Sequence, residues 1–165
     1  MVSVVAAPNT IDDTALAVWA DFLRFHATVT DVLGHELAVR AGMPLTWYDA
    51  LLHLDAAPDG RLRMQELAAA VVLSRSGLTR VVDRLESVGY VERTSCPSDR
   101  RGTNAEITST GRAALHAARP IHLAGVAEHF AAVLSPAQLQ SLGEALRRLL
   151  DASGVGPAPA GECGA

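Results

Sequence analysis

The 165-residue sequence predicts a mainly α-helical fold that carries one small β-hairpin, or wing. Apolar residues between positions 73 and 89 recur at the i, i+3, i+4, i+7 spacing of a one-sided helix. Two β-prone segments, 90–95 and 103–108, follow this helix, and turn formers fill residues 96–102 between them. Long helical stripes flank the unit on both sides. We therefore expect a winged helix-turn-helix lobe between N-terminal and C-terminal helices.

Composition limits the class of protein. The chain is 49% hydrophobic, but no apolar run approaches the roughly 18 residues of a membrane span. The first ten residues lack the basic and apolar regions of a signal peptide. Cys96 and Cys163 lie far apart, which argues against a disulfide framework and against a paired-cysteine metal or redox site. We expect a cytoplasmic protein with no membrane segment and no cofactor.

The net charge of −4 is unevenly distributed. Residues 61–101 hold eight arginines and five acidic residues, hence a local net charge of +3. A basic lobe on an acidic chain is typical of a protein that binds nucleic acid through one surface. We expect double-stranded DNA as the partner of this lobe.

A first helix is predicted over residues 11–41, with Thr10 as its cap and Asp12 and Asp13 in or near its first turn. Mostly apolar residues repeat every three or four positions from Leu16 to Leu37. A helix of this length measures ~45 Å, which is longer than one small lobe covers. Part of the stripe is therefore expected to meet a second copy of the chain.

The middle of the chain predicts a helix at 46–56, a turn at 58–60, a strand at 61–64 and a helix at 65–71. Thr46 and Asp49 form a capping-box pattern, which accounts for Asp49. Arg61 and Arg63 are either phosphate contacts or solvated strand ends, and the sequence favours neither interpretation.

The second helix of the helix-turn-helix is predicted to begin at Ser74 or Ser76 and to end at Gly89. Its polar face carries short or cationic side chains, which enter a DNA major groove without steric hindrance. The residues expected to bind DNA there are Arg75, Ser76, Gly77, Thr79, Arg80 and Arg84.

After the hairpin, Thr108 is predicted to cap a helix over residues 109–133, which Pro120 should kink or split. Residues 135–138, Ser-Pro-Ala-Gln, combine a cap, an N1 proline and a capping-box glutamine. A leucine stripe follows in the last helix: Leu139, Leu142, Leu146 and Leu149.

These elements predict one domain over residues 11–152. The terminal helices at 11–41 and 109–152 are expected to form a dimer, and residues 46–108 to form the winged lobe. Residues 1–10 and 153–165 lack helical periodicity and are expected to be disordered.

Five segments of the chain match one family in sequence and order. They are Ser-Arg-Ser-Gly-Leu-Thr-Arg at 74–80, Asp-Arg-Leu-Glu at 83–86, Gly-Tyr-Val-Glu-Arg at 89–93, Asp-Arg-Arg-Gly at 99–102 and Thr-Ser-Thr-Gly at 108–111. Over about residues 12–150 the sequence resembles the MarR family of transcriptional regulators, and the actinobacterial branch in particular. The resemblance implies a homodimer whose winged lobes read a pseudo-palindromic operator. It also implies repression, relieved by a small lipophilic molecule, as in many members.

The resemblance assigns roles to particular side chains. Arg80 is similar to the residue that reaches base edges in the major groove, where a guanidinium suits guanine O6 and N7. Asp99 and Arg101 match the Asp-x-Arg pattern of the wing, in which the arginine enters the minor groove and the aspartate positions it. Arg100 adds a second wing arginine, and Cys96 is interpreted as an incidental turn residue.

A small aromatic or lipophilic effector is expected in a crevice between the terminal helices and the lobe. The side chains expected to line this crevice are Trp19, Phe22, His26, Trp47 and His53. Core packing is the competing explanation for Trp19, Trp47 and the neighbouring Tyr48.

Two alternatives stay open. The six histidines allow a zinc-responsive regulator of the same fold, although we assign no metal ligands because zinc needs three or four converging ligands. The arginine-rich wing also suits a module that docks on an acidic protein. The chain has no glycine-rich phosphate loop, nucleophile elbow or HExxH motif, so we do not expect an enzyme.

Overall fold

A computed structural model of the chain describes residues 11–96 and 99–154. In chain order the elements are α1 (Asp13–Ala41), α2 (Leu45–Ala56), the 3₁₀ turn η1 (Pro58–Gly60), β1 (Arg61–Arg63), α3 (Met64–Ala70), α4 (Arg75–Ser87), β2 (Val91–Cys96), β3 (Asp99–Ile107), α5 (Ser109–Val126), the π-helix η2 (Ala127–Ala131) and α6 (Pro136–Ala152). The predicted mainly helical fold with a small wing is confirmed. The expected disorder of residues 1–10 and of the tail beyond 154 lies outside the described residues.

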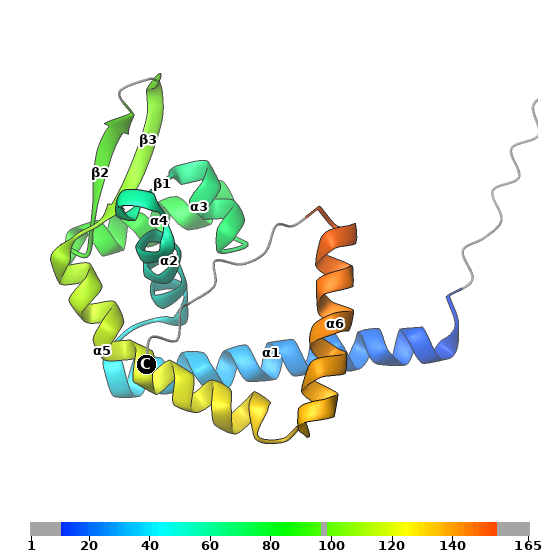
Figure 1. The fold of residues 1–165 in the computed structure, drawn as a ribbon. Helices are drawn as coiled ribbons and strands as arrows, with labels where there is room; N and C mark the ends of the chain where they lie inside the picture. The colour runs from blue at the N-terminus through cyan, green and yellow to red at the C-terminus, as the bar shows by residue number, and fades with distance from the viewer. Residues whose placement is uncertain (1–10, 97–98, 155–165) are drawn as a thin grey trace, which may run out of the picture.

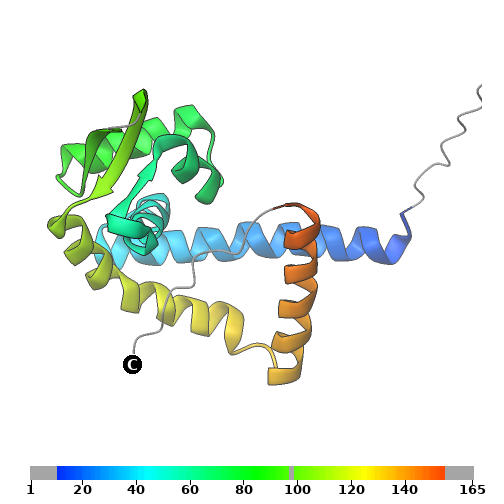
Figure 2. The same ribbon diagram turned by 45° about the horizontal axis from the view of Figure 1, so that its top comes forward.

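The lobe formed by α2–α4 and the three strands lies over the C-terminal end of α1 (Figure 1). Helix α5 leaves the lobe and runs back beside α1, and α6 then turns at a steep angle to α5 and crosses α1 in both views (Figures 1 and 2). His129 Nε2 and Glu36 Oε1 lie 2.7 Å apart where η2 meets α1. No residue of α6 is buried.

The three strands form one antiparallel sheet in the order β1-β3-β2. Val91 pairs with Ile107 across β2 and β3, and both side chains are buried on the face of the sheet that packs against the core. Leu78, Val82 and Leu85 of α4 are fully or almost fully buried in the same core. The inner face of the sheet therefore packs against α4 through this shared core.

Two predicted caps are wrong. Asp12, and not Thr10, caps α1, because its Oδ1 accepts from the Ala15 N–H at 2.6 Å; Thr10 lies outside the described residues. Helix α2 begins at Leu45 after Pro44, with no side-chain cap. Thr46 is already inside this helix, so it does not form a capping box with Asp49. Capping therefore does not explain Asp49.

Pro120 lies inside α5, which continues to Val126. Both views show a bend along this helix (Figures 1 and 2), so of the two predicted outcomes the structure has the kink and not the split. One other boundary differs from the sequence interpretation. Residues 99–102 belong to β3 and not to the predicted turn. Antiparallel pairing extends further up the hairpin than the turn-forming residue types indicate, with a register shift beside Cys96.

Gly111 is expected to tolerate no side chain. A methyl group there would overlap the backbone carbonyl oxygen of Tyr90, which cannot move without breaking the junction of lobe and α5. Gly111→Ala should lower the free energy of unfolding by about 3 kcal/mol, a typical cost of severe overpacking. Urea denaturation at matched protein concentration measures this loss.

The control for this prediction is Gly34→Ala in α1. Its methyl group would meet Leu45 Cβ at an ordinary 3.7 Å, and alanine favours a helix interior over glycine by about 0.5–1 kcal/mol. This variant should be unchanged or more stable. Equal destabilisation by both substitutions would contradict the assigned contact at Gly111.

Candidate DNA-binding surface

Helix α4 begins with a well-formed cap. Ser74 Oγ accepts the N–H of Gly77 at 3.1 Å, and the hydroxyl groups of Ser74 and Ser76 lie 3.2 Å apart. The absence of a side chain at Gly77 also leaves room for the cap, since a Cβ there would lie 3.1 Å from Ser74 Oγ. Gly77 is therefore explained by the cap, at the edge of the exposed face.

One half of α4 packs into the core and the other half faces outward. The exposed side chains include those of Arg75, Ser76, Thr79, Arg80 and Arg84. Thr79 Oγ1 donates to the Arg75 carbonyl oxygen at 2.9 Å, so its hydroxyl group is already bonded within the helix. Most of the predicted DNA-binding residues of α4 thus lie on its exposed face, which carries three arginines.

Arg93 on β2 stabilises this surface, a role that the sequence interpretation missed. Its guanidinium contacts Asp83 Oδ1 at 2.6 Å and also bonds Glu86 Oε2, both on α4. These contacts fix the recognition helix to the wing strand. They also offset two carboxylates that would otherwise repel a phosphate backbone. The i, i+3 spacing of Asp83 and Glu86, with an arginine at the start of the hairpin, is the signal that could have revealed it.

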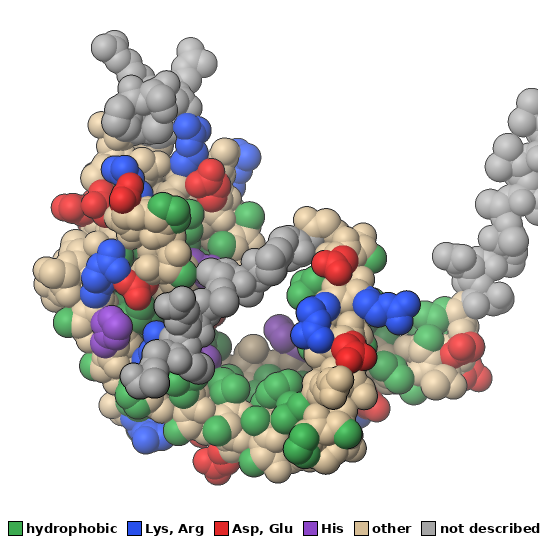
Figure 3. Space-filling view, viewed as in Figure 1, with side chains coloured by type: hydrophobic (Ala, Val, Ile, Leu, Met, Phe, Trp, Pro, Cys, Tyr) green, Lys and Arg blue, Asp and Glu red, His purple; other side chains and the backbone are tan. Residues whose placement is uncertain are grey.

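The β2–β3 hairpin projects beyond the lobe, away from α1 and α5 (Figure 1). Cationic side chains, mixed with acidic ones, gather where the hairpin joins the lobe (Figure 3). Asp99, Arg100 and Arg101 are the first three residues of β3. Their side chains lie outside the described part of the chain, so their predicted contacts with the minor groove stay predictions.

The residues predicted to bind an effector fall into separate groups in the single chain. Trp19 and Phe22 have ring centroids 5.9 Å apart, and those of Phe22 and His26 are 6.3 Å apart, along the exposed half of α1. Trp47 instead packs edge-on against Tyr90 within the lobe. His53 is half-buried on α2, and burial lowers its pKa.

A polar cluster that sequence reasoning missed lies between α2 and α5. The ring centroids of Tyr48 and His122 are 4.4 Å apart, and Tyr48 is 2% exposed. Within the described residues, the buried His122 Nδ1 has no hydrogen-bond partner. Burial raises the pKa of Asp49 to about 6 and lowers that of His122. Perturbed groups of this kind concentrate at functional sites.

Asp49→Asn should stabilise the protein above pH 6. The folded state raises the pKa of Asp49 from 3.8 to about 6, so it favours the protonated carboxyl and loses stability as pH rises through this window. We expect a gain of about 1–2 kcal/mol at pH 8, after allowing for the solvent that still reaches the group. Urea denaturation should give a much smaller gain at pH 4. An equal gain at both pH values would show that the effect is not one of ionisation.

Within residues 11–96 and 99–154, no group of three His, Cys, Asp or Glu side chains is placed to hold a metal ion. Over the same residues, no helix is long and apolar enough to cross a membrane.

The capped, cationic α4, fixed to a three-stranded wing sheet, defines a winged helix-turn-helix DNA-binding protein. The chain belongs to the MarR family of transcriptional regulators and not to a class of enzymes. A model of the MarR family matches residues 41–102. Streptomyces coelicolor Sco3205, a MarR family regulator solved in complex with DNA, is 36% identical with a TM-score of 0.79, over 90% of this chain and 95% of that one. The predicted family and DNA-binding function are confirmed.

Two further proteins are similar to the chain. AbsC, a MarR family regulator from Streptomyces coelicolor, is 31% identical with a TM-score of 0.77, over 86% of this chain and 95% of that one. The transcriptional repressor MprA of Escherichia coli is 32% identical over 79 residues, which are 48% of this chain and 45% of that protein.

Proposed function

We propose that the protein is a repressor that binds a pseudo-palindromic operator as a homodimer and is released by a small aromatic or lipophilic effector. The observation that carries this proposal is the uncovered apolar surface of α1 and α6. The similarity to the repressor MprA supports repression. Because it would act on chromosomal DNA, we place it in the cytoplasm.

Helix α1 is 29 residues long, which is about 43 Å, yet only Leu33 and Leu37 are buried along it. Hydrophobic side chains are visible along α5 and α6 and on the free end of α1 (Figure 3). The large hydrophobic residues exposed on these helices include Leu16, Trp19, Phe22, Leu23, Phe25, Leu123, Leu149 and Leu150. Exposed apolar area of this extent marks an interaction surface, and a second copy of these helices supplies a matching one.

A dimer of this kind presents two copies of α4 to one face of the DNA. Half-sites one helical turn apart require the two helices to lie about 34–36 Å from each other. In our proposal Arg80 reads a guanine in each major groove. Arg101, positioned by Asp99 and accompanied by Arg100, enters the flanking minor groove.

The proposed effector binds between the terminal helices and the lobe. In the proposed dimer, Trp19, Phe22 and His26 line this region from α1, together with Trp47 and His53 from α2. The cluster of Tyr48, Asp49 and His122 supplies polar groups of the kind that orient a ligand in an apolar site. A ligand that pushes α2 away from α5 changes the distance between the two winged lobes of the dimer. A tenfold loss of operator affinity requires about 1.4 kcal/mol of preference for the DNA-free state.

Selection of duplexes from a random library tests the operator and the dimer together. We expect enrichment of an inverted repeat with half-sites about one helical turn apart. The mass of the complex should correspond to two protomers on one duplex. Enrichment of a single half-site by one protomer would contradict the homodimer.

A thermal-shift screen tests the effector. Phenolic acids, urate and other aromatic metabolites are screened first, and each stabilising compound is then titrated against the protein–operator complex. We expect at least one compound to lower operator affinity, and Asp49→Asn to alter that response. If every stabilising compound leaves operator affinity unchanged, release through this crevice is refuted, and constitutive or metal-responsive regulation becomes the better account.

A further inference from the structure

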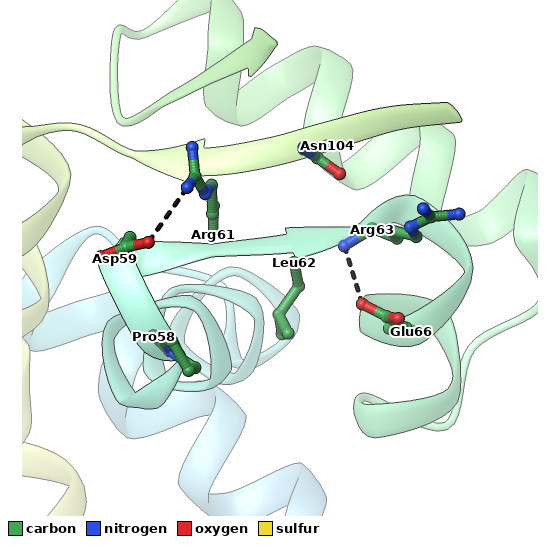
Figure 4. A pocket seen from close by; sticks show the side chains of 7 residues that line it. All are labelled: Pro58, Asp59, Arg61, Leu62, Arg63, Glu66 and Asn104. Atoms are coloured by element: carbon green, nitrogen blue, oxygen red, sulfur yellow. Dashed lines mark hydrogen bonds and ion pairs between the residues drawn. The ribbon is translucent and has the colours of Figure 1, made fainter. Parts of the chain in front are cut away.

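Hydrogen bonds close both ends of α3, the first helix of the helix-turn-helix. At its start, Glu66 Oε2 accepts the Arg63 N–H at 3.1 Å (Figure 4). At its end, the backbone N–H groups of Val72 and Leu73 bond carbonyl oxygens of the last turn at 3.3 and 3.0 Å. This pair of bonds is a Schellman motif, in which the residue after the C-cap adopts a left-handed conformation. Val72 is that residue.

A valine is unusual in this position, which glycine most often occupies. The φ of Val72 is +54°, which glycine adopts freely and a β-branched residue adopts only with strain. Packing within the chain does not compensate, because the Val72 side chain is 90% exposed. The neighbouring Leu73 packs against the core instead. The turn therefore holds a strained and exposed valine where glycine would be more stable.

The position of Val72 in the chain indicates what its side chain contacts. It lies two residues before Ser74, the N-cap of α4, and the N-terminal residues of a recognition helix contact base edges in the major groove. The exposed Ser74, Arg75 and Ser76 that begin this helix are hydrophilic, so Val72 adds an apolar group to a polar end. The apolar group that a base edge presents in the major groove is the C5-methyl group of thymine.

We propose that Val72 is a specificity-determining residue whose side chain contacts the C5-methyl group of one thymine in each half-site. The assignment rests on the proposed reading of an operator by α4. Contact between the two apolar groups removes both from water, which favours the complex. Local backbone strain is found where function requires a particular side chain, and this contact gives the strained turn such a function.

Val72→Gly should make the protein more stable and its binding weaker. Glycine relieves the left-handed strain, so the unfolding temperature at matched protein concentration should rise by roughly 2–4 °C. Loss of one methyl contact weakens binding about fourfold. Because the dimer loses one contact in each half-site, affinity for the selected duplex should fall roughly 15-fold. A lower unfolding temperature would show that valine stabilises this turn, and it would overturn the proposal.

Uracil substitution identifies the contacted thymine, because uracil lacks only the C5-methyl group. Each thymine in one half-site of the selected duplex is replaced in turn, and fluorescence anisotropy measures the affinity. The wild type should bind about fourfold more weakly at one thymine position. Val72→Gly should show no further loss at that position, because its contact with the methyl group is already gone. This coupling separates a direct contact from a general effect of a more flexible turn.

Val88→Ala is the matched control, since Val88 is an exposed valine at the opposite end of α4. It should respond to uracil as the wild type does. If the wild type responds at no thymine, or Val72→Gly responds as the wild type does, the proposal is overturned. A preference for the selected duplex over a scrambled one would in that case still support operator reading by α4. If the wild type has no such preference, the proposed operator reading fails, and the assignment of Val72 fails with it.

Discussion

Replacing Leu142 and Leu146 with aspartate should abolish operator binding while leaving the lobe folded. Both leucines lie on the stripe of α6, a helix with no buried residue in the single chain. Two charges on this stripe would have to be desolvated at the dimer interface, at a cost of several kcal/mol each. Without the dimer, each lobe binds one half-site alone, and the affinity gained from linking the two sites is lost.

Sedimentation velocity measures the oligomeric state, and fluorescence anisotropy with the selected duplex measures binding. Ser141→Asp places one charge on an exposed position of the same helix, outside the leucine stripe. It should remain a dimer and bind normally. A wild-type monomer that binds the operator tightly would contradict the interface.

Arg80→Ala should weaken binding to the specific duplex by about 1–3 kcal/mol, which is roughly 5-fold to 150-fold. The exposed Arg80 lies on the outer face of α4, where its guanidinium can bond guanine O6 and N7 together. The loss should be confined to one base pair in each half-site, where the variant loses its sequence preference. Competition titration with duplexes substituted at each position measures this pattern.

Arg24→Ala is the matched control, since Arg24 is exposed on α1 and paired with Asp21 at 3.3 Å. It should bind every duplex as the wild type does. A uniform loss across all base pairs for Arg80→Ala would make Arg80 a phosphate contact. Wild-type affinity for Arg80→Ala would show that α4 does not read the operator through this residue.

Much of the lobe could be predicted from local patterns. The apolar period of α4 identifies Leu78, Val82 and Leu85 as its buried face, and the structure buries all three. The caps at Ser74, Thr108 and Ser135 also form as expected. These features depend on residues within one or two turns of each other, so the sequence contains them directly.

The wrongly predicted start of α2, and the turn between α3 and α4, have a different origin. Helix α2 begins one residue before Thr46, because the fixed φ of Pro44 already orients the chain for a helix start. Val72, in the turn between α3 and α4, adopts a φ of +54° that favours glycine and is rare for a β-branched residue. Residue type alone would not place this conformation there.

The missed site residues depend on contacts between distant segments. Tyr48 meets His122 only because α5 packs beside α2. Arg93 reaches Asp83 across the gap between the hairpin and α4. Such pairings are set by the packing of whole elements, which local periodicity does not encode.

The central claim is that the exposed face of α4 reads a particular DNA sequence. The direct measurement is the affinity for the selected duplex against that for a scrambled duplex, from about 50 to 200 mM salt. We expect a preference on the order of 10³-fold or more. Affinity for both duplexes should fall steeply as salt rises. Equal affinity for the two duplexes would contradict the claim. An affinity for DNA that does not change with salt concentration would favour a winged-helix module that docks on protein.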